Sequence, residues 1–440
     1  MEEVRGLGHL FMTVFLSTLS GFMVVPAITD ITMAAICPGK DECSLAIYLT
    51  GIQHAVIGMG SLVMMPMVGK LSDAYGRKTM LTIPITLSIF PLAILAYSRS
   101  RYYYYAYYVL RTLIGMLCDG SVHCLALAYV ADKVGEGRRA SVFGILSGVS
   151  SSAFICGSLS SHFLSTASTF QVAGIMAIVA LVYMKIFLPE SLPKEDILVK
   201  ATETECLLEK APKKNFQRYK RLPSFDDLVC LLRTSPAFLH VAVVSFLIHV
   251  AETGLNASLF YFLKAQFHFD KDEFADLTMI AGIAGAISQL ALMPILAPAI
   301  GEERLLSVGL FFFSLHLLLH SIAWSPWVPY AAALMSVLAT FGMPCLRSIA
   351  SKQFGPNEQG KVQGCVTGLS SFANIVSPLA FSPLIATFLS DDAPFHFPGF
   401  SIMIAGLAAM LAFIQSLMMT TSRSTTAYNL SDSNSPRNFV

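Results

Sequence analysis

The segment from Gly69 to Lys78 reads GKLSDAYGRK and places Asp73 four residues before Arg77. A carboxylate and a guanidinium beside helix ends can bind the helix dipoles and each other in one conformation. Glycines at 69 and 76 permit the tight turn that such an arrangement needs. We therefore expect Gly69, Asp73, Gly76, Arg77 and Lys78 to form a tight turn between two helices that is held in one conformation. A degenerate copy, PILAPAIGEER, covers 294–304.

A second group of ionisable residues lies inside one long apolar run. Asp119 and His123 are four residues apart, so they would share a face of a continuous helix and could hold a transferable proton near neutral pH. Arg111 lies two turns earlier on that helix, within the same quarter. It is either part of the same site or a side chain that extends to the nearer membrane interface beside Tyr105 and Tyr108.

Glu252 is the one acid inside the apolar runs of the C-terminal half. A charge at membrane depth costs about 2.5–3.5 kcal/mol on insertion scales, so we expect Glu252 to line a cavity. The alternative is a protonated carboxyl bonded to a neighbouring helix. His249 is a weaker candidate. The remaining candidates, each of which could instead cap a helix or join two helices, are Asp30, Asn374 and Gln289.

The nine cysteines show no spacing typical of a metal site, and no metal or other cofactor is expected. Cys37 and Cys43 share one loop with five residues between them, so a disulfide and two free thiols both remain open. The segment 355–362 matches the first part of a phosphate loop, GxxxxGK, but Val362 replaces Ser or Thr and no strand precedes it. Neither ATP hydrolysis nor any other enzymatic activity is therefore expected, and a net charge of +1 does not suggest a nucleic-acid partner.

The composition places these residues in a membrane. Of 440 residues, 55% are apolar and 13% charged, and the mean hydropathy is +0.64, which excludes an ordinary soluble enzyme. The apolar residues gather into runs long enough to cross a bilayer. We expect twelve spans, near 7–34, 45–68, 79–97, 103–130, 141–163, 168–188, 237–263, 275–299, 304–323, 327–348, 362–389 and 399–420.

The distribution of positive charge predicts the orientation. Alternate loops on one side hold 23 of the 29 Lys and Arg residues, and those on the other side hold 5. The positive-inside rule therefore places both termini and the central linker in the cytosol. We expect a first bundle over 1–190, a cytosolic linker over 191–236, a second bundle over 237–421 and a disordered cytosolic tail over 422–440.

The two halves repeat each other. GILSGVSSSA from Gly144 recurs 220 residues later as GCVTGLSSFA from Gly364, in spans of the same orientation. A parallel repeat of this kind is typical of two six-helix bundles that face a central cavity. The expected fold is thus an all-α membrane protein with twelve transmembrane helices in two pseudo-symmetric bundles.

Over about 400 residues the chain resembles the major facilitator superfamily. Residues 37–43 (CPGKDEC), the Asp73 segment and the Tyr129-Val-Ala-Asp132 end of span four resemble its plant hippocampus-abundant-transcript-like, tetracycline-transporter-like branch, which is similar to drug:proton antiporters and more distantly to proton-coupled folate transporters. The resemblance implies that Asp73 caps the start of span eleven, near 360–364, and that Arg77 pairs with Asp132. It thereby assigns the Asp73 segment to gating, as a latch that closes the cytosolic side. It also implies a link between Arg111 and proton coupling.

One departure weakens antiport as an expectation: the Gly-Pro of the antiporter motif in span five is missing after Gly148. We expect a secondary active transporter of a small organic solute, coupled to H⁺, that works by alternating access as a monomer in the plasma or vacuolar membrane. The alternatives are a proton-independent uniporter and a membrane receptor that does not transport.

Overall fold

The computed structural model describes residues 2–36, 44–191, 236–269, 271–355, 358–389, 393–395 and 397–433. All regular secondary structure in these ranges is helical. The first six spans are built from α1 (Glu2–Ile36), α2 (Ser44–Tyr75), α3 (Arg77–Tyr97), α4 (Arg101–Cys118), α5 (Ser121–Lys133), η1 (Glu136–Arg138), α6 (Arg139–Phe163) and α7 (Thr166–Phe187). The other six are built from α11 (Pro236–Phe267), α12 (Lys271–Ile287), η2 (Ser288–Leu292), α13 (Met293–Ile300), α14 (Glu302–Ser321), α15 (Val328–Ala339), α16 (Gly342–Ser351), α17 (Gln359–Phe388) and α18 (Phe400–Ser433).

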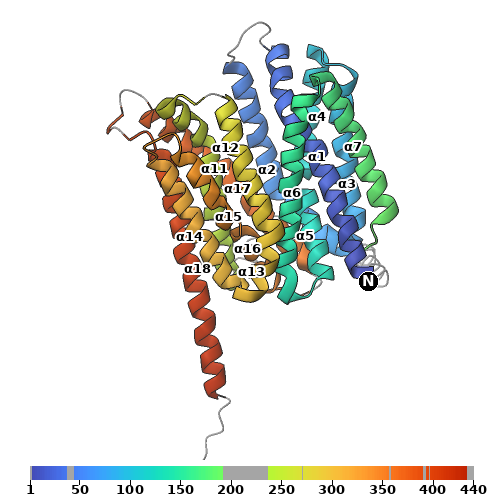
Figure 1. Ribbon diagram of the computed structural model, residues 1–440. Coiled ribbons are helices and arrows are strands. Elements are labelled where there is room, and N and C mark those ends of the chain that lie inside the picture. The colour runs from blue at the N-terminus through green and yellow to red at the C-terminus, as the bar shows by residue number, and fades with distance from the viewer. Residues whose placement is uncertain are drawn as a thin grey trace, which may run out of the picture.

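Within the described residues, twelve helical segments are long and apolar enough to cross a bilayer. This confirms the expected number of spans and the all-α membrane fold. The helices run roughly side by side in two bundles, α1–α7 and α11–α18 (Figure 1). The amino-terminal end of α1 and the last part of α18 lie at the same end of the molecule.

Spans four and ten are interrupted near their middles. The fourth is not the continuous helix expected over 103–130, because α4 ends at Cys118 and α5 begins at Ser121. Asp119 is extended and Gly120 has φ 77°, a left-handed conformation that glycine adopts without strain. In the second bundle α15 ends at Ala339 and α16 begins at Gly342, so the interruption is repeated.

Each bundle has its own apolar packing. Buried residues of α1, α3, α5, α6 and α7 form one core, and a second cluster in the same bundle includes the aromatic start of α4. The second bundle has two corresponding clusters, one of which also takes in Ala140 at the start of α6. Each bundle is therefore held together largely by its own helices.

The bundles meet chiefly where α2 packs on α17 and α6 packs on the α12–α13 segment, with smaller contacts of α5 with α17 and of α6 with α16. Small residues allow the first pair to approach closely: a Cβ at Gly364 would overlap the backbone of Met65. In the second pair a Cβ at Gly148 would come within 2.7 Å of Leu290. Helix contacts through glycine are typical of packing inside membranes.

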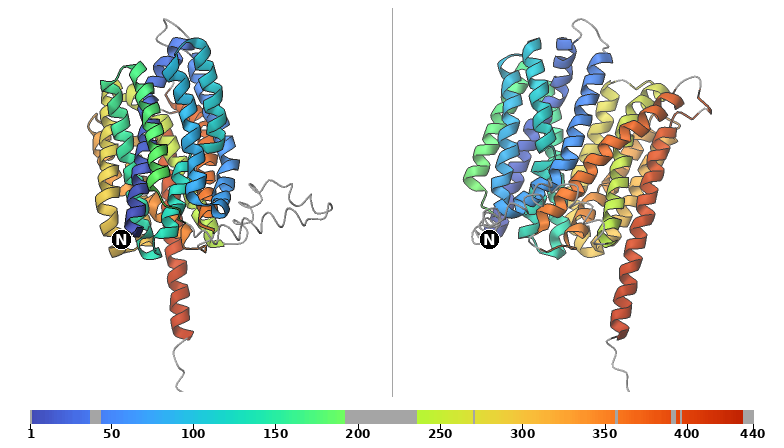
Figure 2. Two further views of the ribbon diagram at one scale, coloured as in Figure 1. Left: turned by 90° about the vertical axis from the view of Figure 1, so that its right-hand side faces the viewer. Right: turned by 180° about the vertical axis from the view of Figure 1, so that it is seen from behind.

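Several expected segments fall outside the described residues, including most of the linker, 192–235, and the loop with Cys37 and Cys43. The carboxyl-terminal segment corrects an expectation. The helix α18 continues to Ser433 and projects beyond the bundle, as both views in Figure 2 show, over part of the segment where a disordered tail was expected. A helix that is already formed can propagate into polar sequence without a new nucleation cost.

Candidate functional site

Asp73, near the end of α2, caps the first turn of α17 in the other bundle. Its Oδ1 accepts a hydrogen bond from the backbone N–H of Gly360 at 2.9 Å, and its Oδ2 accepts one from Lys361, also at 2.9 Å. The carboxylate is buried. It thereby satisfies two N–H groups that have no partner within their own helix and meets the positive end of the helix dipole.

Arg77, the first residue of α3, is fully buried beside Asp73. Its Nη2 lies 2.5 Å from Asp73 Oδ1, and its Nε donates to Asp132 Oδ2 at 2.9 Å. Its Nη1 donates to Ser72 Oγ at 2.5 Å. One guanidinium therefore joins the ends of α2, α3 and α5 and orients the carboxylate that caps α17.

The α2–α3 turn depends on a residue that the sequence analysis missed. Gly76 has φ 94°, and Glu190, just after α7, accepts hydrogen bonds from the backbone N–H of Arg77 at 2.7 Å and of Lys78 at 3.1 Å. The side chain of Lys78 donates to the carbonyl of Lys185 at 2.9 Å. An acid placed directly after span six was the available signal, but its partner is distant in sequence.

Gly69 and Gly360 bring the two backbones together at this latch. A Cβ at Gly69 would overlap the carbonyl of Gly360, and a Cβ at Gly360 would overlap Arg77 Nη1. The latch thus needs glycine at both positions, because any side chain would separate the helices before Asp73 could reach its two N–H donors.

The second bundle carries a related ion pair with the charges exchanged. Glu302 follows Gly301 as Arg77 follows Gly76, and Lys352 lies 220 residues after Asp132, the same offset as the internal repeat. Lys352 Nζ lies 2.9 Å from Glu302 Oε2, with Glu302 buried. The sequence analysis recognised the degenerate copy at Gly301 but missed this pair, because the charges are reversed.

A further contact is repeated in the two halves. Arg139 donates to the carbonyl of Ala131 at 3.0 Å, and Gln359 donates to that of Ser351 at 3.1 Å. The two donors are 220 residues apart, and so are the two acceptors. Arg139 also donates through Nη1 to the hydroxyl of Ser351 at 2.9 Å. The same end of the molecule therefore has a third hydrogen bond between the bundles, beside the two that Asp73 accepts. We call this end, which carries the α2–α3 turn, the Asp73 end.

The expected Asp119–His123 pair is wrong as a helical pair. Because the helix is interrupted at Asp119 and Gly120, the two side chains do not lie one turn apart on a shared face. Asp119 instead lies 3.9 Å from Arg111 Nη2, and both side chains are well exposed, 53% and 42%. The pair is a loose ion pair that solvent would weaken.

His123 lies near an arginine that the sequence analysis did not name as a candidate. Arg347, on α16, is only 7% exposed, and its charge acts on His123 from the other bundle. Its Nη1 donates to Gln363 Oε1 at 3.2 Å and to Thr367 Oγ1 at 3.4 Å. The expected tenth span, 327–348, includes Arg347 next to its end, so the available signal was a charge inside an apolar run.

Candidates on α11 face α17. The ring nitrogens of His249 bond Ser370 Oγ at 2.5 Å and the carbonyl of Ser245 at 2.7 Å. The side chain of Glu252 is exposed, and no described ionisable group forms an ion pair with it. The hydroxyl of Thr253 donates to Asn374 Oδ1 at 2.8 Å. Asn374 thus joins two helices of one bundle while its own side chain remains exposed.

Gln289 lies in the π-helical turn η2 and accepts a hydrogen bond from Ser151 on α6 at 3.2 Å. It therefore contacts the opposite bundle. Asp30 belongs to α1, but its side chain is outside the described residues, as are Cys37 and Cys43. Among the described residues no cluster of three or more His, Cys, Asp or Glu could hold a metal ion.

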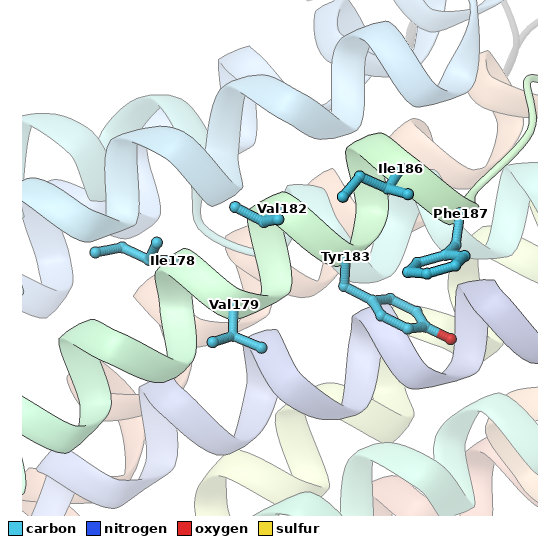
Figure 3. A pocket seen from close by; sticks show the side chains of 6 residues that line it. All are labelled: Ile178, Val179, Val182, Tyr183, Ile186 and Phe187. Atoms are coloured by element: carbon cyan, nitrogen blue, oxygen red, sulfur yellow. The ribbon is translucent and has the colours of Figure 1, made fainter.

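A groove of about 270 Å³ on the outer face of α7 is apolar (Figure 3). Its lining residues are Ile178, Val179, Val182, Tyr183, Ile186 and Phe187. The one polar group among them, the Tyr183 hydroxyl, is already bonded to His9 Nδ1 at 2.9 Å. All six lining residues belong to α7, and their apolar surface suits lipid chains.

Two six-helix bundles related by an internal repeat are the architecture of a class of membrane transporters. The model of the Major Facilitator Superfamily matches residues 10–247 and again 241–429. The chain belongs to this superfamily and is an integral, multi-pass membrane protein.

Curated relatives include the hippocampus abundant transcript 1 protein of human, 22% identical over 337 residues, which cover 76% of this chain and 65% of that protein. The chain thus aligns with just under two thirds of that relative. The class G tetracycline resistance protein of Vibrio anguillarum is 25% identical over 339 residues, 76% of this chain and 80% of the relative.

Two solved structures share the fold. The human organic anion transporter MFSD10 (TETRAN) superposes with a TM-score of 0.75 and 19% identity, covering 94% of this chain and 100% of that one. A bacterial homologue of the iron transporter ferroportin superposes with a TM-score of 0.66 and 14% identity, covering 94% and 99%.

Proposed function

We propose that the chain is a secondary active transporter that moves a small organic solute by alternating access and takes its energy from a proton gradient. The observation that carries the proposal is the capping of α17 by Asp73, because this contact joins the two bundles through groups that must separate if the bundles rock. The Asp73 end is the cytosolic end under this proposal, since the loops there carry most of the Lys and Arg residues.

Proton coupling is supported by ionisable groups at membrane depth. Glu252 is accessible, lacks a described charged partner and lies on a helix that contacts α17. Protonation of this carboxyl would change its interactions in one access state more than in the other. A difference of this kind is what shifts the equilibrium between the two access states. Asp119 is the second candidate, in its loose pair with Arg111.

The names of the relatives mention tetracycline resistance, organic anions and iron, so they do not agree on one substrate. They agree with transport of small solutes. The proposed transporter functions as a monomer without ATP, in the plasma or vacuolar membrane. A proton-independent uniporter is the second candidate. It is favoured by the exposure of the Arg111–Asp119 pair, because exposure would keep the charge state of the pair the same in both access states.

The test is flux in liposomes that contain the purified full-length protein. Radiolabelled solutes are screened with an imposed pH gradient, without one, and with a protonophore. Flux that depends on the gradient and collapses with the protonophore supports the proposal. Flux that ignores the gradient identifies a uniporter, and ligand binding without any flux identifies a receptor.

A further inference from the structure

We propose that Arg347 binds an anionic group, a carboxylate or a phosphate, on the solute that this protein carries. The proposal rests on the transport function proposed above and deepens it by assigning the substrate class. It starts from the burial of a guanidinium with which no carboxylate among the described residues pairs.

The two buried arginines differ in their surroundings. Arg77 is neutralised by two carboxylates, Asp73 and Asp132. Arg347 is 7% exposed, and no carboxylate among the described residues forms an ion pair with it. Taking an unpaired cation out of water is costly, so an anion that reached Arg347 would gain both the charge interaction and its hydrogen bonds.

The guanidinium retains donors for such a ligand. Its described hydrogen bonds both leave from Nη1, to the side chains of Gln363 and Thr367. These two bonds fix the plane of the group on one side. The Nε and Nη2 edge bonds none of the described residues. A guanidinium with two parallel N–H groups on one edge matches the two oxygens of a carboxylate or a phosphate.

The position of Arg347 suits a site that opens alternately to either side. Its neighbours include Cys124 on α5, across the boundary between the bundles, and His249 on α11. A Cβ at Gly120, in the break of span four, would lie 3.2 Å from the side chain of Thr367. The break therefore brings the first bundle against the residue that holds Arg347. An anion bound there would contact both halves.

The imidazole of His249 extends this polar surface along α17 through Ser370. Among these groups the free donors belong to Arg347, because Gln363, Thr367 and His249 already donate to carbonyl groups of the protein. A cationic solute would meet uncompensated positive charge at the same place. The geometry therefore favours organic anions over cations and over neutral solutes of the same shape.

The experiment uses purified full-length protein in detergent and measures its melting temperature with each of four probes. Benzoate and glucose 6-phosphate represent the two anion chemistries, and benzamide and glucose are their neutral counterparts. We expect at least one anion to raise the melting temperature of the wild type at up to about 10 mM, which would saturate a site with a Kd of about 1 mM. The response to benzoate or to glucose 6-phosphate distinguishes the carboxylate from the phosphate.

Arg347→Gln should weaken the binding of that anion by about tenfold or more, because the hydrogen bonds that are lost are made to a charged group. Arg347→Lys keeps the charge and should keep weaker anion binding, which separates a lost site from a misfolded protein. Arg304→Gln removes the same charge from an exposed position and should bind as the wild type does.

Stabilisation by the neutral probes equal to that by the anions would overturn the proposal. So would the absence of any anion effect on the wild type, or an unchanged anion effect in Arg347→Gln. Liposome flux separates this failure from that of the transport function. Transport of a cationic or neutral solute with no anion binding would support the transport function and overturn the anion site. Anion binding without flux would support the anion site and overturn the transport function.

Discussion

The carboxylate of Asp73 accepts a hydrogen bond at 2.9 Å from the backbone N–H of Gly360, which lies in the opposite bundle. A buried contact of this kind between a charged acceptor and a helix terminus is worth more than a neutral hydrogen bond. Separation of the bundles at the Asp73 end must break it. The contact therefore stabilises the conformation described here over any conformation that is open at that end.

Replacing the charge at the latch should stop transport. In Asp73→Asn the amide can accept through one oxygen but carries no charge for Arg77 or for the helix dipole, so we expect flux to fall by about tenfold or more. Flux in liposomes and the amount of protein at the membrane are measured together. The control is Glu136→Gln, an exposed acid at the same end, which should transport normally. Unchanged flux in Asp73→Asn would contradict the latch.

Adding one methyl group at the α2–α17 contact should act through sterics alone. In Gly360→Ala the new Cβ would overlap Arg77 Nη1, so we expect a lower melting temperature and reduced flux with all charges kept. Gly137→Ala serves as the control, because a Cβ there meets no atom within 4 Å. Equal behaviour of the two variants would show that the close approach at Gly360 is not required.

The ion pair of the second bundle should contribute to stability in a way that depends on both partners. Lys352→Met leaves the buried carboxylate of Glu302 unpaired, and we expect it to lower the free energy of unfolding by about 3 kcal/mol. Glu302→Gln with Lys352→Met should recover most of this loss. Chemical unfolding of the two single variants and the double variant measures the coupling. Additive losses would argue against an interaction between these side chains.

Proton coupling should depend on Glu252. Glu252→Gln retains the size of the side chain but cannot release a proton, so the pH dependence of flux should flatten while solute binding persists. Asp276→Asn changes an exposed acid on α12 and should leave the profile as it is in the wild type. A profile in Glu252→Gln with the wild-type shape would remove this carboxyl from the coupling mechanism.

The number of spans and the class of fold were predictable because length and hydropathy decide whether a helix can cross a bilayer. The interruption of span four was not predictable from the sequence. Asp119 and Gly120 sit in an apolar run that reads as one helix, and the left-handed φ of Gly120 becomes visible only with the helix it packs against. The expected face shared by Asp119 and His123 failed for that reason.

The latch residues were predictable from a short motif, since Asp73 and Arg77 lie four residues apart on adjoining helix ends. Their partners were harder to find. The resemblance to a family pointed to Asp132, but Glu190 and Lys352 act through contacts with residues more than 45 positions away. Arg347 was missed because it lies next to the expected end of the tenth span, whereas its helix continues to Ser351 and its side chain is buried.

The central claim is that the Asp73 carboxylate holds the two bundles together at one end. Gly135 and Gly355 occupy equivalent exposed positions in the two bundles, and a Cβ at either meets no atom within 4 Å, so spin labels can be placed there in a background without other reactive cysteines. The distance between the labels should shift toward longer values in Asp73→Asn than in the otherwise unchanged protein. Identical distance distributions in the two proteins would contradict the claim.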